Sequence, residues 1–213
     1  MATAPAPPRP TRPSADDTRD RILTAALDLF SERSFEGATT RQIAERAGVT
    51  QPLLHHHFGG KDELWRASID RLFAQLHSVL DDRVDGLRGV DELTTAQLIV
   101  REFVGFSAAH PQLHRIIMQE CKTDGPRIDW LVDTHIRPLY ASTAQRLQHL
   151  ADTGLIAPFP AVHLYYLLTG AGATMFVLAP ECRRLTGIDP FDPAVIEQHA
   201  DAVVALLFAQ PQE

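Results

Sequence analysis

Residues 39–64 read TTRQIAERAGVTQPLLHHHFGGKDEL, and this stretch decides the fold. Thr39 and Gln42 form a capping box, because the hydroxyl accepts from the backbone while the glutamine side chain reaches back to the cap. Gly48 tolerates positive φ and ends the first short helix. Thr50 caps a second short helix. Two short helices joined by a three-residue turn that contains glycine form a helix-turn-helix.

The second short helix has one buried stripe, formed by Leu54 and Phe58 at helical spacing. The positions left to face a partner are Gln51, Pro52, Leu53, His55 and His56. Glutamine can address adenine bidentately, and leucine can meet a thymine methyl. Exposed N–H groups at helix starts can hold phosphates. The alternative is a helical corner that serves only for packing.

Composition bounds the remaining possibilities. The 213 residues are 45% hydrophobic and 22% charged, which permits a large core and excludes wholesale disorder. The net charge of −7 excludes binding of nucleic acid through bulk positive charge, but not through a local basic patch. Two cysteines cannot build a disulfide scaffold or a four-sulfur zinc site, so we expect a cytoplasmic protein.

The long segments predict an all-α chain, because apolar residues recur with the helical period and never alternate over a sustained run. Beside the two short helices, we expect helices over 16–33, 61–87, 92–109, 111–122, 126–152, 161–178 and 192–209. Pro138 is expected to kink the segment 126–152 and Gly154 to end it. Residues 161–179 lack Asp, Glu, Lys and Arg, and we favour burial over a membrane span for this stretch.

Residues 18–72 resemble the DNA-binding domain of the tetracycline-repressor (TetR) family. The matching stretches are RDRILTAALDLFSERSFEGATTRQIAERAGVT and LLHHHFGGKDELW, about a quarter of the chain. Residues 1–13 hold five prolines and no apolar run, so we expect a disordered arm there, and an arm that reaches into a DNA groove is the alternative. The resemblance implies a helix-turn-helix domain over 14–60 and a helical effector-binding and dimerisation domain over 61–213. It further implies a ligand-responsive transcriptional repressor that binds a palindromic operator in double-stranded DNA as a homodimer. No enzymatic activity, cofactor, metal or membrane partner is expected.

The resemblance also assigns DNA contacts to individual positions. These are Thr39, Thr40 and Arg41 at the start of one helix, Thr50, Gln51, Pro52, Leu53, His55 and His56 on the recognition helix, and Lys61 as the phosphate-binding lysine. Two positions depart from the family pattern: His55 stands where tyrosine is common, and Pro52 where glycine is frequent. Histidine keeps a hydrogen-bond donor but has a shorter reach.

The last two predicted helices fit a homodimer interface. An uncharged helix with several small residues allows close approach, and two helices from each protomer would form a four-helix seam about a two-fold axis. The residues assigned to this interface are Leu167, Gly170, Thr174, Val203, Leu206 and Leu207. Burial within a monomer is the alternative, and the resemblance favours the dimer.

An effector pocket is expected among the helices between the head and the last two helices. The candidate lining residues are Phe103, Phe106, Met118, Trp130 and Tyr166, with His110 and Thr134 as polar anchors. Their apolar bias indicates a hydrophobic or aromatic effector. Each of these residues fits a plain core position equally well.

Two other classes of protein compete with a regulator. Asp129, Asp133 and His135 lie close together in the sequence, with Cys121 one helix away, which raises a small helical enzyme. The sequence has neither a nucleophile elbow nor a glycine-rich phosphate loop, so these aspartates are better interpreted as solvated charges. A helical interaction protein without DNA binding is the third possibility. The triple histidine does not indicate a metal, because consecutive helical residues point about 100° apart.

Overall fold

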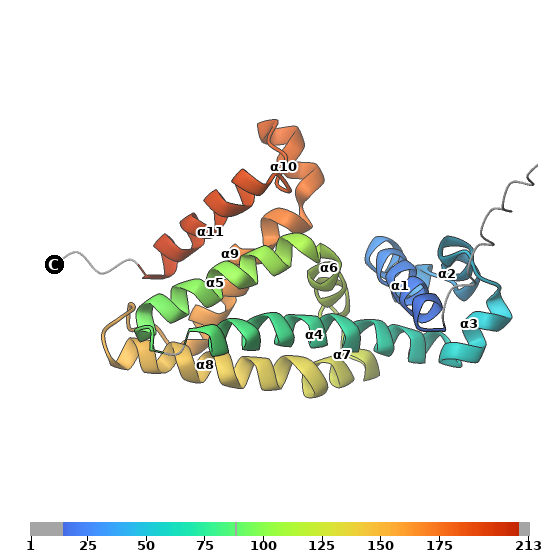
Figure 1. Ribbon diagram of the computed structural model, residues 1–213, viewed down its shortest axis with the longest axis horizontal. Coiled ribbons are helices and arrows are strands. Elements are labelled where there is room, and N and C mark those ends of the chain that lie inside the picture. Colours follow the sequence, from blue (N-terminus) through green and yellow to red (C-terminus); the bar gives the residue numbers. More distant parts are fainter. Residues whose placement is uncertain (1–14, 88, 209–213) are drawn as a thin grey trace, which may run out of the picture. The chain divides into compact units, whose positions relative to one another are not determined.

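The computed structural model describes residues 15–87 and 89–208, and the predicted arm over 1–13 lies outside them. The chain divides into two compact units, of which the first ends at Ser68 and the second begins at Ile69. Every regular element in the described part is helical, which confirms the predicted all-α class (Figure 1). The elements are α1 (Ala15–Gly37), α2 (Thr40–Ala47), α3 (Gln51–Phe58), α4 (Lys61–Gly86), α5 (Glu92–Ala109), α6 (Pro111–Glu120), α7 (Pro126–Leu131), η1 (Val132–Ile136), α8 (Arg137–Asp152), α9 (Ala161–Val177), α10 (Ala179–Thr186) and α11 (Pro193–Phe208).

In the first unit, α1 packs on α2 and α2 packs on α3. The buried face of α1 carries the apolar residues that the helical period selects, among them Ile22, Ala26 and Phe30. Ser34 interrupts this helix with φ 60°, an uncommon conformation for a residue other than glycine. The regular part of α1 therefore ends where the sequence predicted it to end.

The two short helices have the predicted caps. The Thr39 hydroxyl accepts from the Gln42 N–H at 3.2 Å, and Gln42 Oε1 accepts from the Thr39 N–H at 3.2 Å. Gly48 closes α2 in the left-handed region at φ 65°. The Thr50 hydroxyl accepts from the Leu53 N–H at 3.4 Å and starts α3. Local signals therefore cap both ends of the turn between α2 and α3, and Arg21 of α1 also donates to the Gly48 carbonyl at 3.3 Å.

The first turns of α4 belong to the core of the first unit. Leu64, Trp65 and Ser68 are buried, and the Trp65 ring meets Phe35 edge-on at 6.3 Å. The first unit therefore extends beyond residue 60, where the sequence analysis placed the boundary between the domains. The division between the units falls inside α4.

In the second unit, α5 packs against α9 and α11, while α9 also contacts α6 and α8. One buried cluster joins the end of α8 to α5 and α9 through Ala96, Leu147, Leu150, Ala151, Ile156 and Leu164. The predicted helix over 126–152 is instead divided into α7, the π-helical turn η1 and α8. Pro138 has no N–H for the carbonyl four residues earlier and its ring needs space there, so the turn before it widens.

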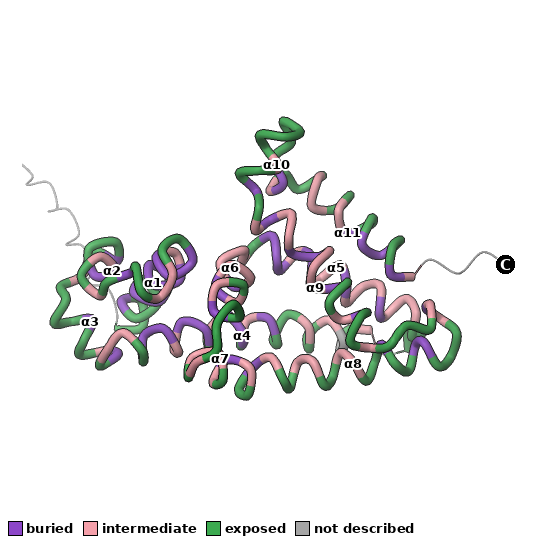
Figure 2. Tube along the Cα trace, turned by 180° about the vertical axis from the view of Figure 1, so that it is seen from behind, coloured by how far each residue is buried: buried purple, intermediate pink, exposed green. Residues whose placement is uncertain are grey.

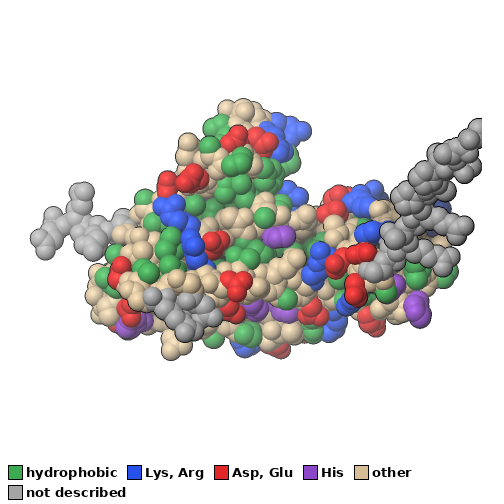
Figure 3. Space-filling model, in the orientation of Figure 1, with side chains coloured by type: hydrophobic (Ala, Val, Ile, Leu, Met, Phe, Trp, Pro, Cys, Tyr) green, Lys and Arg blue, Asp and Glu red, His purple; other side chains and the backbone are tan. Residues whose placement is uncertain are grey.

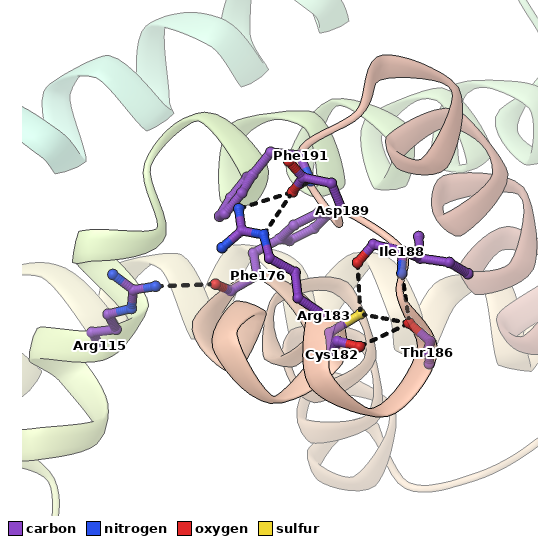
Figure 4. Close-up of polar contacts among 8 residues, drawn as sticks. All are labelled: Arg115, Phe176, Cys182, Arg183, Thr186, Ile188, Asp189 and Phe191. Atoms are coloured by element: carbon purple, nitrogen blue, oxygen red, sulfur yellow. Dashed lines mark hydrogen bonds and ion pairs between the residues drawn. The ribbon is translucent and has the colours of Figure 1, made fainter.

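The helix α10 is absent from the sequence-based prediction. It follows α9 after a bend of 72°, and Ala179 is its one buried residue. Most of α10 is coloured as exposed in Figure 2. Polar contacts rather than an apolar stripe hold it: Arg183 donates to Asp189 at 2.9 Å, and the Ile188 N–H donates to the Thr186 hydroxyl at 3.1 Å (Figure 4). A prediction that relies on apolar residues recurring every three or four positions misses such a helix.

The apolar stretch 161–179 ends at this bend. In the described part of the chain, no single helix has the length and hydropathy needed to cross a membrane, and the bent pair α9 and α10 meets the criterion only when the two are taken together.

Candidate DNA-binding surface and effector pocket

The helix α3 displays one face of its side chains. Leu54 and Phe58 are its buried residues, with 0% and 7% of their surface exposed. The predicted outward positions Gln51, Pro52, Leu53, His55 and His56 are all exposed, and so is the cap residue Thr50. The short helix thus presents amide, imidazole and aliphatic groups to a partner.

The start of α2 contributes to the same surface. Thr39 and Arg41 are exposed and Thr40 is half-buried. Gln51 Nε2 donates to Thr40 Oγ1 at 3.1 Å, which joins the first residue of α2 to the first residue of α3. This hydrogen bond therefore holds the two helix starts side by side.

His55 makes its contacts within α3 and its cap. Its Nδ1 lies 2.6 Å from the Gly59 carbonyl oxygen, and its Nε2 lies 3.4 Å from Gln51 Nε2. Gly59 in turn donates its N–H to the His55 carbonyl at 2.8 Å. Both ring nitrogens of His55 therefore have neighbours within the protein.

The basic side chains around α2 and α3 have acidic or aromatic neighbours. Residues 14–65 contain six Lys or Arg and nine Asp or Glu, a net charge of −3. Arg41 pairs with Glu45 at 2.9 Å. The Lys61 ammonium lies 4.4 Å from the centre of the Phe35 ring. Few free positive charges remain, so DNA binding by this surface is expected to depend only modestly on salt.

The second unit contains a pocket that is lined by residues of α4, α5, α8, α9 and α11. A cavity of about 200 Å³ adjoins one of about 60 Å³, and the two share Leu80, Ile99, Val100, Leu139, Thr143 and Leu168. The larger cavity has polar groups at its margin, from His77, Asp81, Ser142 and Arg146. The smaller one reaches Phe103, Tyr165 and Thr169. The pocket is therefore largely apolar with one polar end.

Phe103 is the predicted pocket residue that lines these cavities. Met118, Thr134 and Tyr166 are exposed, because they lie on the outer faces of α6, η1 and α9. Phe106 is buried against the His110 ring, with the ring centres 4.5 Å apart, and Trp130 lies edge-on to His135. Phe106, His110, Met118, Trp130, Thr134 and Tyr166 do not line these two cavities, and their place in an effector site stays a prediction.

Two lining residues missed from the sequence carried signals. Thr143 is a polar residue within the apolar stripe of the segment 126–152, and such a residue marks a possible cavity wall. Tyr165 precedes the chosen Tyr166, and neighbouring helical residues point about 100° apart, so only one of them faces inward. Burial, with added effects of nearby Tyr166 and Cys121, raises the pKa of Tyr165.

The residues considered for an enzyme do not form one cluster. Asp129 and Asp133 are exposed, and Asp133 pairs with Arg137 at 2.7 Å. His135 is buried and its Nε2 contacts Asp70 at 2.8 Å, while its ring stacks on Phe73 at 4.4 Å. Burial lowers the pKa of His135, and the contact with Asp70 opposes this. Within the described part of the chain, no three His, Cys, Asp or Glu side chains are grouped as metal ligands would be.

Apolar side chains are exposed on α9, α10 and α11, and hydrophobic groups gather over α10 and α11 in Figure 3. Of the predicted interface residues, Leu167 and Leu206 are 49% and 62% exposed. Gly170 and Thr174 are half-buried. Val203 and Leu207 are only 2% and 7% exposed, because they lie on the buried side of α11, the helix that packs on α5. Both side chains face the interior of this chain, and their place in an interface between protomers stays a prediction.

The fold and the exposed α3 define a helix-turn-helix DNA-binding protein. Residues 22–67 match the model of the bacterial regulatory proteins of the tetR family. The chain is 30% identical over 167 residues to the HTH-type transcriptional repressor KstR2 of Mycolicibacterium smegmatis, covering 76% of this chain and 77% of that one. It is 25% identical over 190 residues to the HTH-type transcriptional regulator RutR of Escherichia coli K12, covering 87% and 86%.

The solved structures agree with this assignment at the level of the fold. The crystal structure of AibR in complex with isovaleryl coenzyme A and operator DNA superposes with a TM-score of 0.72 at 19% identity, covering 91% of this chain and 99% of that one. The chain belongs to the TetR family and is a DNA-binding transcriptional regulator. This excludes the enzyme considered from the sequence, since the family consists of regulators.

Proposed function

We propose that the chain is a repressor that binds a palindromic operator as a homodimer and leaves it when a small, largely apolar effector binds the second unit. The observation that carries the proposal is the pairing of an outward-facing α3 with an apolar pocket that has one polar end. The relative KstR2 is named as a repressor.

In this proposal, α3 enters the major groove and the start of α2 binds the backbone. Gln51 and Leu53 face base edges, Thr39 and Arg41 face phosphates, and Lys61 adds a further phosphate contact at the first turn of α4. Selection of bound duplexes from a random pool tests this. A palindromic consensus supports the proposal, and a chain that selects no sequence contradicts it.

The homodimer rests on the exposed apolar residues of α9 and α11. Val162, Tyr166 and Leu167 are exposed on α9, and Leu206 is exposed on α11. A second copy can bury them in a self-complementary contact about a two-fold axis. Leu167→Asp is expected to convert the dimer to a monomer in analytical ultracentrifugation and to abolish cooperative operator binding. Val79→Asp, at an exposed apolar residue of α4, is the matched control.

The effector is proposed to lie along the pocket with its apolar part toward Phe103 and Leu168 and its polar group toward Arg146. Arg146 forms no ion pair with any residue in the described part of the chain. The AibR structure holds isovaleryl coenzyme A, which supports testing organic acids and their coenzyme A thioesters alongside neutral apolar compounds.

The effector is proposed to act on DNA binding through α4, which carries Lys61 at its start and the pocket residues His77 and Leu80 further along. A ligand shifts the equilibrium only if it binds one arrangement better, by about 1.4 kcal/mol for each tenfold loss of operator affinity. A reporter gene behind the selected operator distinguishes repression from activation.

Filling the pocket tests its role. Thr143→Phe is expected to leave operator binding intact and to abolish release by the effector, because Thr143 lines both cavities. Gln145→Phe, on an exposed position of the same helix, is the control. Unchanged release in the Thr143 variant would place the effector elsewhere.

A further inference from the structure

Four residues of the first unit form a chain of hydrogen bonds along α3. The Gly59 carbonyl oxygen lies 2.6 Å from His55 Nδ1, and His55 Nε2 lies 3.4 Å from Gln51 Nε2. Gln51 Nε2 also lies 3.1 Å from Thr40 Oγ1. The chain ends at the amide of the side chain proposed to read DNA.

The direction of these bonds follows from the Gly59 carbonyl. A carbonyl oxygen only accepts, so His55 Nδ1 must carry a hydrogen. In neutral imidazole the other nitrogen is then an acceptor. His55 Nε2 therefore faces the amide NH₂ group of Gln51 and repels its carbonyl oxygen.

Both hydrogens of the Gln51 amide are thereby used within the protein, one by His55 and one by Thr40. The carbonyl oxygen Oε1 has no hydrogen-bond partner among residues 15–87 and 89–208, and Gln51 is exposed. The atom offered to a partner is an acceptor. Turning the amide over would set this oxygen against the lone pair of His55 Nε2.

The imidazole itself is held at two points. Gly59 donates its N–H to the His55 carbonyl at 2.8 Å while its own carbonyl accepts from the ring. Gly59 has φ 75°, in the left-handed region that favours glycine, and this conformation turns its carbonyl back along α3. The cap of the recognition helix thus sets the tautomer of His55.

We propose that His55 is a positioning residue that fixes the Gln51 amide with its carbonyl oxygen toward DNA, so that Gln51 selects an amino base over a keto base. In the major groove, the amino groups of adenine and cytosine are donors, whereas guanine and thymine present acceptors at the corresponding edge. The inference rests on the proposed role of α3. It replaces the bidentate contact with adenine, which needs a free amide hydrogen.

The experiment measures base preference with the full-length chain. Gln51→Ala, compared with the wild type in selection from a random duplex pool, identifies the operator position that Gln51 reads. Synthetic operators then carry cytosine or uracil at that position, because the two differ in an amino against a keto group and uracil lacks the thymine methyl. The wild type is expected to bind the cytosine operator about fivefold more tightly, as for one hydrogen bond.

Three variants separate positioning from folding. His55→Leu is expected to bring the cytosine-to-uracil ratio close to one. His55→Gln is expected to keep it, because its amide can donate to Gly59 and accept from Gln51. His57→Leu, at a half-buried neighbour that lies outside the hydrogen-bond chain and is not among the assigned DNA contacts, is expected to leave the ratio unchanged.

A fourth variant, Thr40→Val, covers the case in which His55→Leu does not fold. Thr40→Val releases one amide hydrogen of Gln51 and is expected to raise the preference for adenine at this position. A wild type that prefers the uracil operator overturns the inference and leaves the proposed function intact. So does the combined result that His55→Leu does not change the cytosine-to-uracil ratio and Thr40→Val does not change the preference for adenine. A pool that gives no consensus overturns both.

Discussion

The two units of the chain differ in how far apart in the sequence their stabilising contacts lie. In the first unit, the turn between α2 and α3 depends on caps that act over three residues and on one glycine with positive φ. In the second unit, the pocket takes its walls from five helices, and Leu76 and Thr169 line the same cavity. A surface that reads DNA needs fixed local geometry, whereas a pocket depends on contacts distant in the sequence.

The largest expected effect comes from Leu54, one of the two buried residues of the recognition helix. Leu54 has no exposed surface, and Leu54→Ala is expected to lower the free energy of unfolding by about 3 kcal/mol because it removes packing and leaves a cavity. Leu53→Ala removes the same atoms from a side chain that is 37% exposed. Urea unfolding of both variants checks this, and equal losses would show that α3 does not face the core through Leu54.

The second prediction addresses His114, a half-buried histidine of the second unit. The Ser107 hydroxyl donates to the Phe103 carbonyl at 2.8 Å, so its oxygen accepts from His114 Nε2 at 3.0 Å. Burial lowers the pKa of His114 from 6.5 to about 4. Between these values the unfolded chain binds more protons, so stability is complete above pH 6.5 and declines as the pH falls toward 4.

At pH 4 this histidine is expected to cost about 3 kcal/mol of the free energy of unfolding. His114→Gln keeps a donor for Ser107 and does not titrate, so its stability is expected to fall less between pH 7 and pH 4. Denaturant unfolding of wild type and variant at both pH values gives the comparison. Parallel losses in the two proteins would contradict the assignment of the acid sensitivity to His114.

The range of these interactions also explains what the sequence could predict. The caps at Thr39 and Thr50 and the buried stripe of α3 were all predictable, because each signal and its partner lie within a few residues. In the pocket only Phe103 was identified, since apolar period selects buried residues without showing which of them border a cavity. The helix α10 escaped because its contacts, such as Arg183 with Asp189, are polar.

A third prediction tests the close contact between α5 and α9. A Cβ atom at Gly172 would lie 2.7 Å from Phe103 Cε1, and the Phe103 ring lines the pocket. Gly172→Ala is expected to displace this ring and lower the free energy of unfolding by about 1–2 kcal/mol. Gly105→Ala on α5 has no neighbour within 4 Å of the new Cβ and is expected to gain stability from helix propensity. Thermal unfolding of both distinguishes crowding from propensity.

The smallest expected effect concerns the capping box that starts α2. The Thr39 side chain accepts from the Gln42 N–H, and removing it leaves that donor without its partner. Thr39→Ala is expected to lower the free energy of unfolding by about 1 kcal/mol. Thr39→Ser is expected to keep most of the stabilisation by the cap, because serine retains the hydroxyl. Thr39 is also proposed to contact a DNA phosphate. The Thr39→Ala variant is therefore expected to lose more operator affinity than its loss of stability alone explains. A Thr39→Ala variant as stable as Thr39→Ser would show that the cap contributes little, and that the core around Ile43 and Ala44 holds α2 in place.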